Sequence, residues 1–195
     1  MNTLRLARPH AIMLVGIPGS GKTFFAEQFS NMFKLPFINI ADVQDQIGDD
    51  TNTEKVVLYL LSEIMKTEQT FLFEGNSATR TSRAEFSRWA RSKGYQPLLV
   101  WVQTSRDTCM SRIAKDRSMA TDQFEDQLEI FSAPHPDEKA VVISGKHTYV
   151  SQAKVILEHL GKQNRELIKG ANDKHLASRS SAAPDRYGKS NRAMG

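Results

Sequence analysis

The sequence predicts an α/β protein built on a doubly wound parallel sheet, on the strength of three observations. Residues 1–161 alternate five short apolar runs with longer amphipathic segments. Each run is nearly continuous in its apolar character, which is typical of parallel strands covered on both faces. A glycine-rich turn joins the first run directly to the first helical segment. Alternating strands and helices favour a parallel sheet with right-handed crossovers.

The expected elements follow one another in a regular order. We expect one strand at each apolar run, at residues 11–15, 37–40, 70–73, 98–102 and 140–143. Helical periodicity predicts helices at residues 22–33, 53–67, 82–93, 105–114, 122–131 and 149–160. Gly94 and Gly161 stand where two of these helices are expected to end.

Length and composition limit the class of protein. The chain has 195 residues, of which 39% are apolar, enough for a single core of moderate size. No apolar run approaches the roughly 20 residues that a membrane-spanning helix needs, so we expect no membrane association. Cys109 is the one cysteine, which excludes an internal disulfide and a cysteine-rich zinc site. We therefore expect a cytoplasmic protein.

The charge is unevenly distributed along the chain. Residues 162–195 hold eight Lys or Arg and three Asp or Glu, whereas residues 1–161 hold eighteen and nineteen. The sequence therefore predicts a folded domain at 1–161 and a basic, largely disordered tail at 162–195, without regular structure from residue 172. A basic arm of this kind is expected to attract polyanions.

A phosphate-binding motif follows the first predicted strand. Residues 16–23 read GIPGSGKT and fit the pattern G-x-x-x-x-G-K-[ST] in full. The glycines allow backbone N–H groups to converge on phosphate oxygens, and the following helix adds its dipole. Lys22 is expected to bridge the β- and γ-phosphates of ATP, and the Thr23 hydroxyl to bind Mg²⁺. The predicted nucleotide-binding residues are Gly16, Pro18, Gly19, Ser20, Gly21, Lys22 and Thr23.

Two acids follow predicted strands. Glu74 directly follows the run at residues 70–73, where a carboxylate would lie beside the phosphate loop and hold Mg²⁺. Asp42 follows the run at residues 37–40, at the edge of the sheet that faces the ligand crevice. A carboxylate at that place can accept the proton of an attacking hydroxyl.

A basic segment follows the fourth predicted strand. Phosphoryl transfer needs cations around the transferred group and protection from water, and a mobile arginine-bearing lid supplies both. Arg112 and Arg117 are the candidates, provided that the helix breaks into a lid near Lys115. The chain has no N-K-x-D sequence for guanine specificity and is small for a motor domain. The motifs therefore favour a small phosphotransferase.

Four segments together resemble the small P-loop kinases, specifically the kinase module of phage-type polynucleotide 5′-hydroxyl kinases. They read GIPGSGKTFFAEQF, FINIADVQDQI, FLFEGNSATRTSR and TSRDTCMSRIAKDR, within residues 10–131. The resemblance implies a three-layer P-loop NTPase sandwich, with a five-stranded parallel sheet of order 2-3-1-4-5 and a helical lid. It also implies that Asp42 is the general base and Arg117 a lid arginine. In this fold the loop after the fifth strand passes the nucleotide base, so Lys146 or His147 is expected to contact it.

The identity of the phosphoryl acceptor stays open at this point. The resemblance favours a polynucleotide 5′-end, but Gln44 stands where those kinases have an arginine that helps to hold substrate phosphate. A nucleoside, a nucleotide or another small metabolite is the alternative acceptor. A nucleotide-binding regulator with weak hydrolysis is the alternative from another class of protein.

Overall fold

A computed structural model describes residues 4, 6–48 and 50–180, with side chains omitted at residues 50, 51 and 170–180. The sheet is parallel throughout and has the order β2-β3-β1-β4-β5, which confirms the predicted topology. Its strands are β1 (His10–Val15), β2 (Phe37–Asn39), β3 (Phe71–Glu74), β4 (Gln96–Gln103) and β5 (Val141–Ser144). All five coincide with the predicted apolar runs to within two residues.

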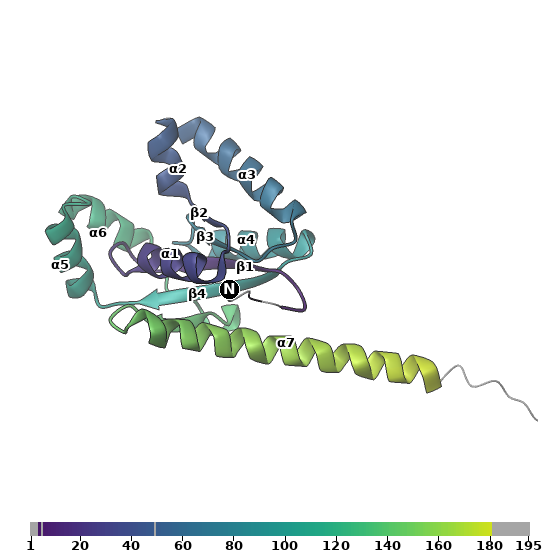
Figure 1. Ribbon diagram of the computed structural model, residues 1–195. Helices are drawn as coiled ribbons and strands as arrows, with labels where there is room; N and C mark the ends of the chain where they lie inside the picture. The colour runs from purple at the N-terminus through teal and green to yellow at the C-terminus, as the bar shows by residue number, and fades with distance from the viewer. Residues whose placement is uncertain (1–3, 5, 49, 181–195) are drawn as a thin grey trace, which may run out of the picture.

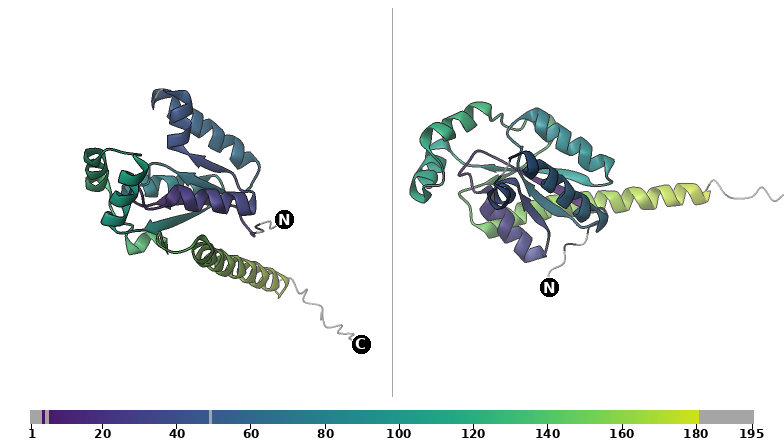
Figure 2. Two further views of the ribbon diagram at one scale, coloured as in Figure 1. Left: turned by 60° about the vertical axis from the view of Figure 1, so that its left-hand side comes forward. Right: turned by 90° about the horizontal axis from the view of Figure 1, so that it is seen from above.

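Helices cover both faces of the sheet and form three layers (Figure 1). One face packs against α1 (Lys22–Phe33) and α7 (Tyr149–Ser180), the other against α3 (Asp50–Lys66) and α4 (Arg80–Ser92). The helix α2 (Ile40–Ile47) leads into α3, and the 3₁₀ turn η1 (Pro136–Glu138) precedes β5. The remaining pair, α5 (Arg106–Asp116) and α6 (Thr121–Ile130), forms a lid at one end of the sheet (Figures 1 and 2). The helix α5 thus ends at Asp116, next to Lys115, which is the break that a lid carrying Arg112 and Arg117 would need.

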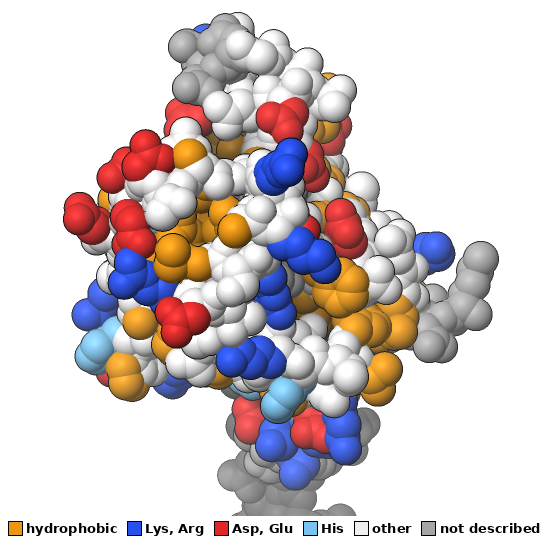
Figure 3. All heavy atoms as spheres, turned by 90° about the vertical axis from the view of Figure 1, so that its left-hand side faces the viewer, with side chains coloured by type: hydrophobic (Ala, Val, Ile, Leu, Met, Phe, Trp, Pro, Cys, Tyr) orange, Lys and Arg blue, Asp and Glu red, His pale blue; other side chains and the backbone are white. Residues whose placement is uncertain are grey.

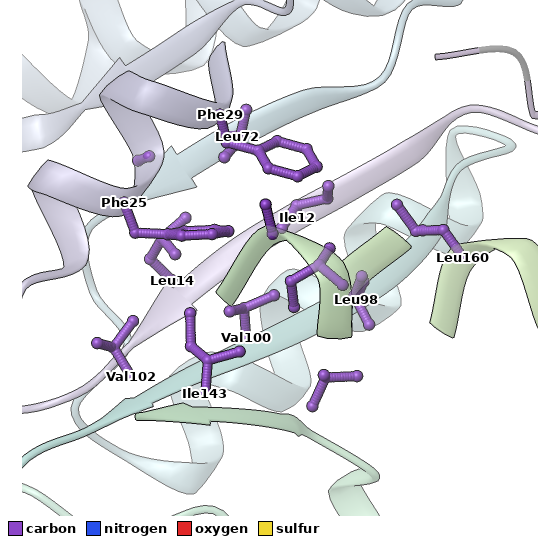
Figure 4. Close-up of a cluster of buried hydrophobic side chains, with 14 of the residues drawn as sticks. Ile12, Leu14, Phe25, Phe29, Leu72, Leu98, Val100, Val102, Ile143 and Leu160 are labelled. Carbon is purple, nitrogen blue, oxygen red and sulfur yellow. The ribbon is translucent and has the colours of Figure 1, made fainter. Parts of the chain in front are cut away.

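Side-chain alternation along β1 divides the core into two halves. Ile12 and Leu14 face α1 and α7, where they pack against Phe25 and Phe29 (Figure 4). Met13 faces the opposite layer with residues of α3 and α4. Because both faces of the strand are covered, every residue of β1 is buried, as the continuous apolar run predicts.

The helix α2 was not predicted. The sequence suggests a strand through residue 40, but β2 ends at Asn39 and α2 begins at Ile40. The Asn39 side chain accepts a hydrogen bond from Ala41 N at 3.1 Å, so it caps the first turn of the helix. Asp42 therefore lies in the first turn of a helix instead of directly at a strand end.

The last helix is longer than predicted. It continues through Gly161 to Ser180, so the expectation of no regular structure is wrong for residues 172–180. Contacts with the N-terminal segment hold its middle turn: Asn164 Oδ1 accepts from Ala7 N at 2.6 Å, and Gln163 Oε1 lies 3.1 Å from His10 Nε2. A single glycine costs a helix only about 1 kcal/mol, which such contacts offset. Its far end projects from the body (Figure 2); residues 181–195 lie outside the described part.

Within the described residues, the structure contains no helix that is both long and apolar enough to cross a membrane.

Candidate active site

The predicted phosphate loop connects β1 to α1 in a tightly constrained conformation. Gly19 has a φ of 73°, and a Cβ atom there would lie 2.8 Å from the carbonyl oxygen of Cys109 on α5. Any other residue would therefore be both strained and in collision with the lid helix. The lack of a side chain at Gly19 thus lets the phosphate loop lie directly against α5, which is the helix that carries Arg112.

Arg112 fastens three segments of this site together. Its guanidinium donates to the carbonyl oxygens of Gly19 and Ser20 at 3.0 and 3.2 Å, and to that of Gly145 at 2.8 Å. Thr104 donates to the same Ser20 oxygen at 2.9 Å. The fork-shaped guanidinium thus joins the phosphate loop, the lid and the loop after β5. Arg112 therefore lies at the site, where it holds the phosphate loop through hydrogen bonds to the backbone carbonyl groups of that loop.

Lys22 and Glu74 form an ion pair at the centre of the site. Lys22 Nζ lies 3.7 Å from Glu74 Oε1, and the two side chains are only 14% and 12% exposed. Burial lowers the pKa of Lys22, and the neighbouring Glu74 opposes that shift. Burial raises the pKa of Glu74, while Lys22 and a hydrogen bond with Thr23 lower it. The structure thus brings Lys22, Thr23 and Glu74 together, as predicted for a phosphate and Mg²⁺ site.

The donor set fits a magnesium ion that completes its coordination with substrate and water. Glu74 Oε2 is buried and has no hydrogen-bond partner among the described residues. This carboxylate oxygen is therefore available to bind a cation. The Thr23 hydroxyl is close enough to the Glu74 carboxyl group to lower its pKa through a hydrogen bond. The described part of the chain contains no group of three or more His, Cys, Asp or Glu that could hold a metal by itself. Mg²⁺ commonly uses one or two protein ligands together with phosphate oxygens and water.

Two hollows meet at this ion pair. The lid-side hollow has a volume of about 790 Å³ and lies between the phosphate loop, α5 and the loop after β5. The α2-side hollow has a volume of about 500 Å³ and lies between the phosphate loop, the start of α2, the loop at residues 75–79 and the end of α6. Lys22, Glu74, Pro18 and Ala41 line both. A group bound in one hollow can therefore face a group bound in the other across Lys22 and Glu74.

The remaining predicted residues occupy different places. Gly19, Gly21, Thr23 and Lys146 line the lid-side hollow, and Gly16 lines the α2-side hollow. Ser20 is fully buried and lines neither hollow, so it contributes its carbonyl group rather than its hydroxyl.

Asp42 and Arg117 are not brought into either hollow. Asp42 is exposed on the first turn of α2, although its charge raises the pKa of Glu74 and thus acts on the site. Arg117 is exposed at the end of α5, with a φ of 50°. Their roles as base and as lid arginine stay predictions that require movement of α2 and of the lid.

An arginine that no sequence motif indicates fixes one wall of the α2-side hollow. Arg83 on α4 is fully buried and binds both carboxylate oxygens of Glu138, at 2.8 and 2.9 Å. It also donates to the carbonyl oxygens of Ser77, Ala78 and Ser132 at 2.9–3.2 Å. Ser132 N donates in turn to Ala78 O at 2.9 Å. No local sequence signal marks this arrangement, because its partners lie up to 55 residues away.

The strand, the glycine-rich loop, the following helix and the acid on the neighbouring strand define a P-loop nucleotide-binding protein. The chain matches the model of the AAA domain family over residues 12–134, more than half of its length, and belongs to that family. A search among curated proteins finds no match for the sequence.

Solved structures support the fold assignment. A gluconokinase from Sinorhizobium meliloti 1021 superposes with a TM-score of 0.62 at 17% identity, covering 83% of this chain and 97% of its own. The APS kinase of Mycobacterium tuberculosis, in complex with AMPPNP and APS, has a TM-score of 0.61 at 15% identity, covering 79% and 98%. A sugar kinase from Janibacter sp. HTCC2649 has a TM-score of 0.57 at 19% identity, covering 77% and 93%. At these identities the likeness shows a P-loop kinase fold.

Proposed function

We propose that this protein is an ATP-dependent kinase that transfers the γ-phosphoryl group to a hydroxyl of a small metabolite. The observation that carries the proposal is the position of Lys22 and Glu74, which line both hollows and lie 3.7 Å apart. A hydrolase or regulator needs a nucleotide site alone, whereas a kinase needs a second site that opens on the γ-phosphate. The kinase fold of the structural neighbours supports the same function.

The residues of the chain divide the work of transfer. The phosphate loop holds the triphosphate, and Lys22 neutralises charge on the transferred group. Mg²⁺, held by Thr23 and Glu74, would supply further positive charge at the phosphates. The acceptor hydroxyl oxygen bonds to the γ-phosphorus, the bond from that phosphorus to the β,γ-bridging oxygen breaks, and ADP leaves. Asp42 is the predicted acceptor of the hydroxyl proton.

A small acceptor fits the α2-side hollow better than a polynucleotide end. The hollow holds about 500 Å³, and Lys22 is the one Lys or Arg among the described residues that line it. A polynucleotide relies on many phosphate contacts with Lys and Arg. Among the side chains that the structure describes on the face that carries the lid, positive, negative and apolar ones are interspersed, without one continuous basic area (Figure 3). Polyanion binding by the tail at 162–195 stays a prediction.

Transfer from ATP labelled in the γ-phosphate tests the proposal. The acceptors are a panel of hydroxylated metabolites, nucleosides and nucleotides, and DNA and RNA oligonucleotides with 5′-hydroxyl ends. We expect label in a small acceptor, dependent on Mg²⁺ and lost in Lys22→Ala but not in Lys154→Ala, an exposed lysine of α7. Label in oligonucleotide ends alone would favour a polynucleotide kinase. Release of labelled phosphate without any labelled acceptor would favour a regulator with weak hydrolysis.

A further inference from the structure

A third hollow, between α3 and α4, opens beside the α2-side hollow. It has a volume of about 350 Å³ and shares Ile40, Asn76 and Ser82 with its neighbour. Val57, Leu61, Phe73, Phe86 and Trp89 give it an apolar, largely aromatic wall. Phe73 and Phe86 stack with ring centroids 5.4 Å apart and planes inclined by 6°. We call it the α3–α4 hollow.

The charges around these two hollows exclude anions. Glu54 and Glu85 line the α3–α4 hollow, and no Lys or Arg stands among its described lining residues. Among the described residues that line the α2-side hollow, Lys22 is the one Lys or Arg, and it already pairs with Glu74 and is expected to bind the phosphates of ATP. Arg83 is nearby, but Glu138 and three carbonyl oxygens occupy its donors. An anionic acceptor would therefore be desolvated without a counter-charge, which is unfavourable.

The polar groups of the α2-side hollow suit hydroxyl groups instead. Its described lining includes the uncharged side chains of Asn39, Asn76, Ser77, Thr79 and Gln127. Amides and hydroxyls both donate and accept hydrogen bonds, so they satisfy alcohol groups at either end. Ile130 and Phe131 from the end of α6 add apolar surface opposite them.

We propose that the acceptor is a hydroxylated molecule without an anionic group, and that its apolar arm occupies the α3–α4 hollow. This inference rests on the proposed kinase function and specifies the acceptor that the function would use. The reacting hydroxyl then lies beside Lys22 and Glu74 in the α2-side hollow. Aromatic and branched side chains of α3, α4 and β3 hold the arm, which gains affinity from burial of apolar surface.

Fluorescence of Trp89 reports occupation of the hollow without requiring catalysis. The chain has two tryptophans, so the variant Trp101→Phe leaves Trp89 as the one emitter. Three probes separate arm and charge: 4-nitrophenyl β-D-glucopyranoside is neutral with an aromatic arm, methyl β-D-glucopyranoside lacks the arm, and 4-nitrophenyl β-D-glucuronide adds a carboxylate. We expect saturable quenching by the first probe, with a half-maximal concentration at least about tenfold lower than that of the glucuronide. The methyl glucoside competes at least about tenfold more weakly.

A charge variant provides the matched control. Glu85 is exposed on α4, so Glu85→Arg is expected to fold and to bring the glucuronide within about threefold of the neutral probe. Glu27→Arg, an exposed position on α1 that lines none of the three hollows, should leave the ratio unchanged. Equal or tighter binding of the glucuronide by the Trp101→Phe protein, or no saturable quenching by any aryl probe, would overturn the assignment.

Transfer assays with the same probes separate this inference from the proposed function. Equal rates of phosphorylation with and without the aryl arm, or faster phosphorylation of gluconate than of neutral polyols, would support the kinase function and overturn the subsite. Binding of the neutral aryl probe without transfer to any acceptor would support the subsite and overturn the kinase.

Discussion

Lys22 Nζ lies 3.7 Å from Glu74 Oε1, at the boundary between the lid-side and α2-side hollows. The pair joins two elements, the start of α1 and the end of β3, that are neighbours because β3 lies next to β1 in the sheet. Burial destabilises both charged forms, and each charge relieves the other. The pair is therefore a preformed place for phosphate and a divalent cation.

The raised pKa of Glu74 predicts how stability depends on pH. Because its folded pKa lies above its unfolded value, the folded state binds more protons between the two values. The free energy of unfolding of the ligand-free protein should then fall as the pH rises from about 4 through the raised pKa. Urea unfolding from about pH 4 to about pH 8 measures the slope, and Glu74→Gln should flatten it. An unchanged slope in Glu74→Gln would show that other groups cause it.

Asp42→Asn tests the predicted general base. The substitution keeps the shape of the side chain but removes the proton acceptor, so kcat should fall by about 10²–10⁴ while ATP affinity stays nearly constant. Asp45→Asn, also exposed on α2, is the matched control and should keep full activity. Loss of ATP binding in Asp42→Asn would assign Asp42 to the metal, and full activity would remove it from the mechanism.

Arg112→Met tests the fastening of the phosphate loop. Three charge-assisted hydrogen bonds to carbonyl oxygens disappear, each worth about 1.5–3 kcal/mol, and the loop loses its link to the loop after β5. We expect KM for ATP to rise by at least about tenfold. Arg106→Met on the same helix removes a largely exposed ion pair with Glu125 and should leave KM unchanged. Equal KM values for the two variants would contradict the fastening role.

Arg83→Met tests the wall of the α2-side hollow. It leaves the mostly buried Glu138 carboxylate and three carbonyl oxygens without their donor, which should lower the free energy of unfolding by about 3–5 kcal/mol. Arg80→Met removes an exposed contact with Asp137 at 3.7 Å and should cost less than about 1 kcal/mol. Chemical denaturation compares the two, and similar losses would mean that the Arg83 network contributes little.

The sequence predicts the sheet well because its strands are buried on both faces and its first motif is local. The run at residues 11–15 and the loop at 16–23 each indicate structure without reference to distant residues. The helix α2 was missed because Asn39 ends a strand and caps a helix within one residue. The continuation of α7 through Gly161 was missed because the contacts that accompany it, from Gln163 and Asn164 to residues near the N-terminus, join positions more than 150 residues apart and leave no local signal.

The candidate site shows the same division. Lys22, Thr23 and Glu74 are predictable, since the motif and the parallel topology place them together. The Arg83–Glu138 pair joins residues 55 positions apart, and no pattern in the sequence relates them. Arg117 has the residue type that a lid needs but is exposed at the end of α5, so residue type alone does not fix its role.

The stoichiometry of phosphoryl transfer distinguishes a kinase from a nucleotide hydrolase. A pool of cellular small molecules is incubated with ATP, Mg²⁺ and either the wild-type protein or Lys22→Ala, and ADP and all phosphorylated products are quantified by mass spectrometry. We expect one small molecule to become heavier by one phosphoryl group, and the wild-type protein alone to form this product in an amount equal to that of ADP. ADP formed without an equal amount of a phosphorylated small molecule would contradict the proposed kinase function.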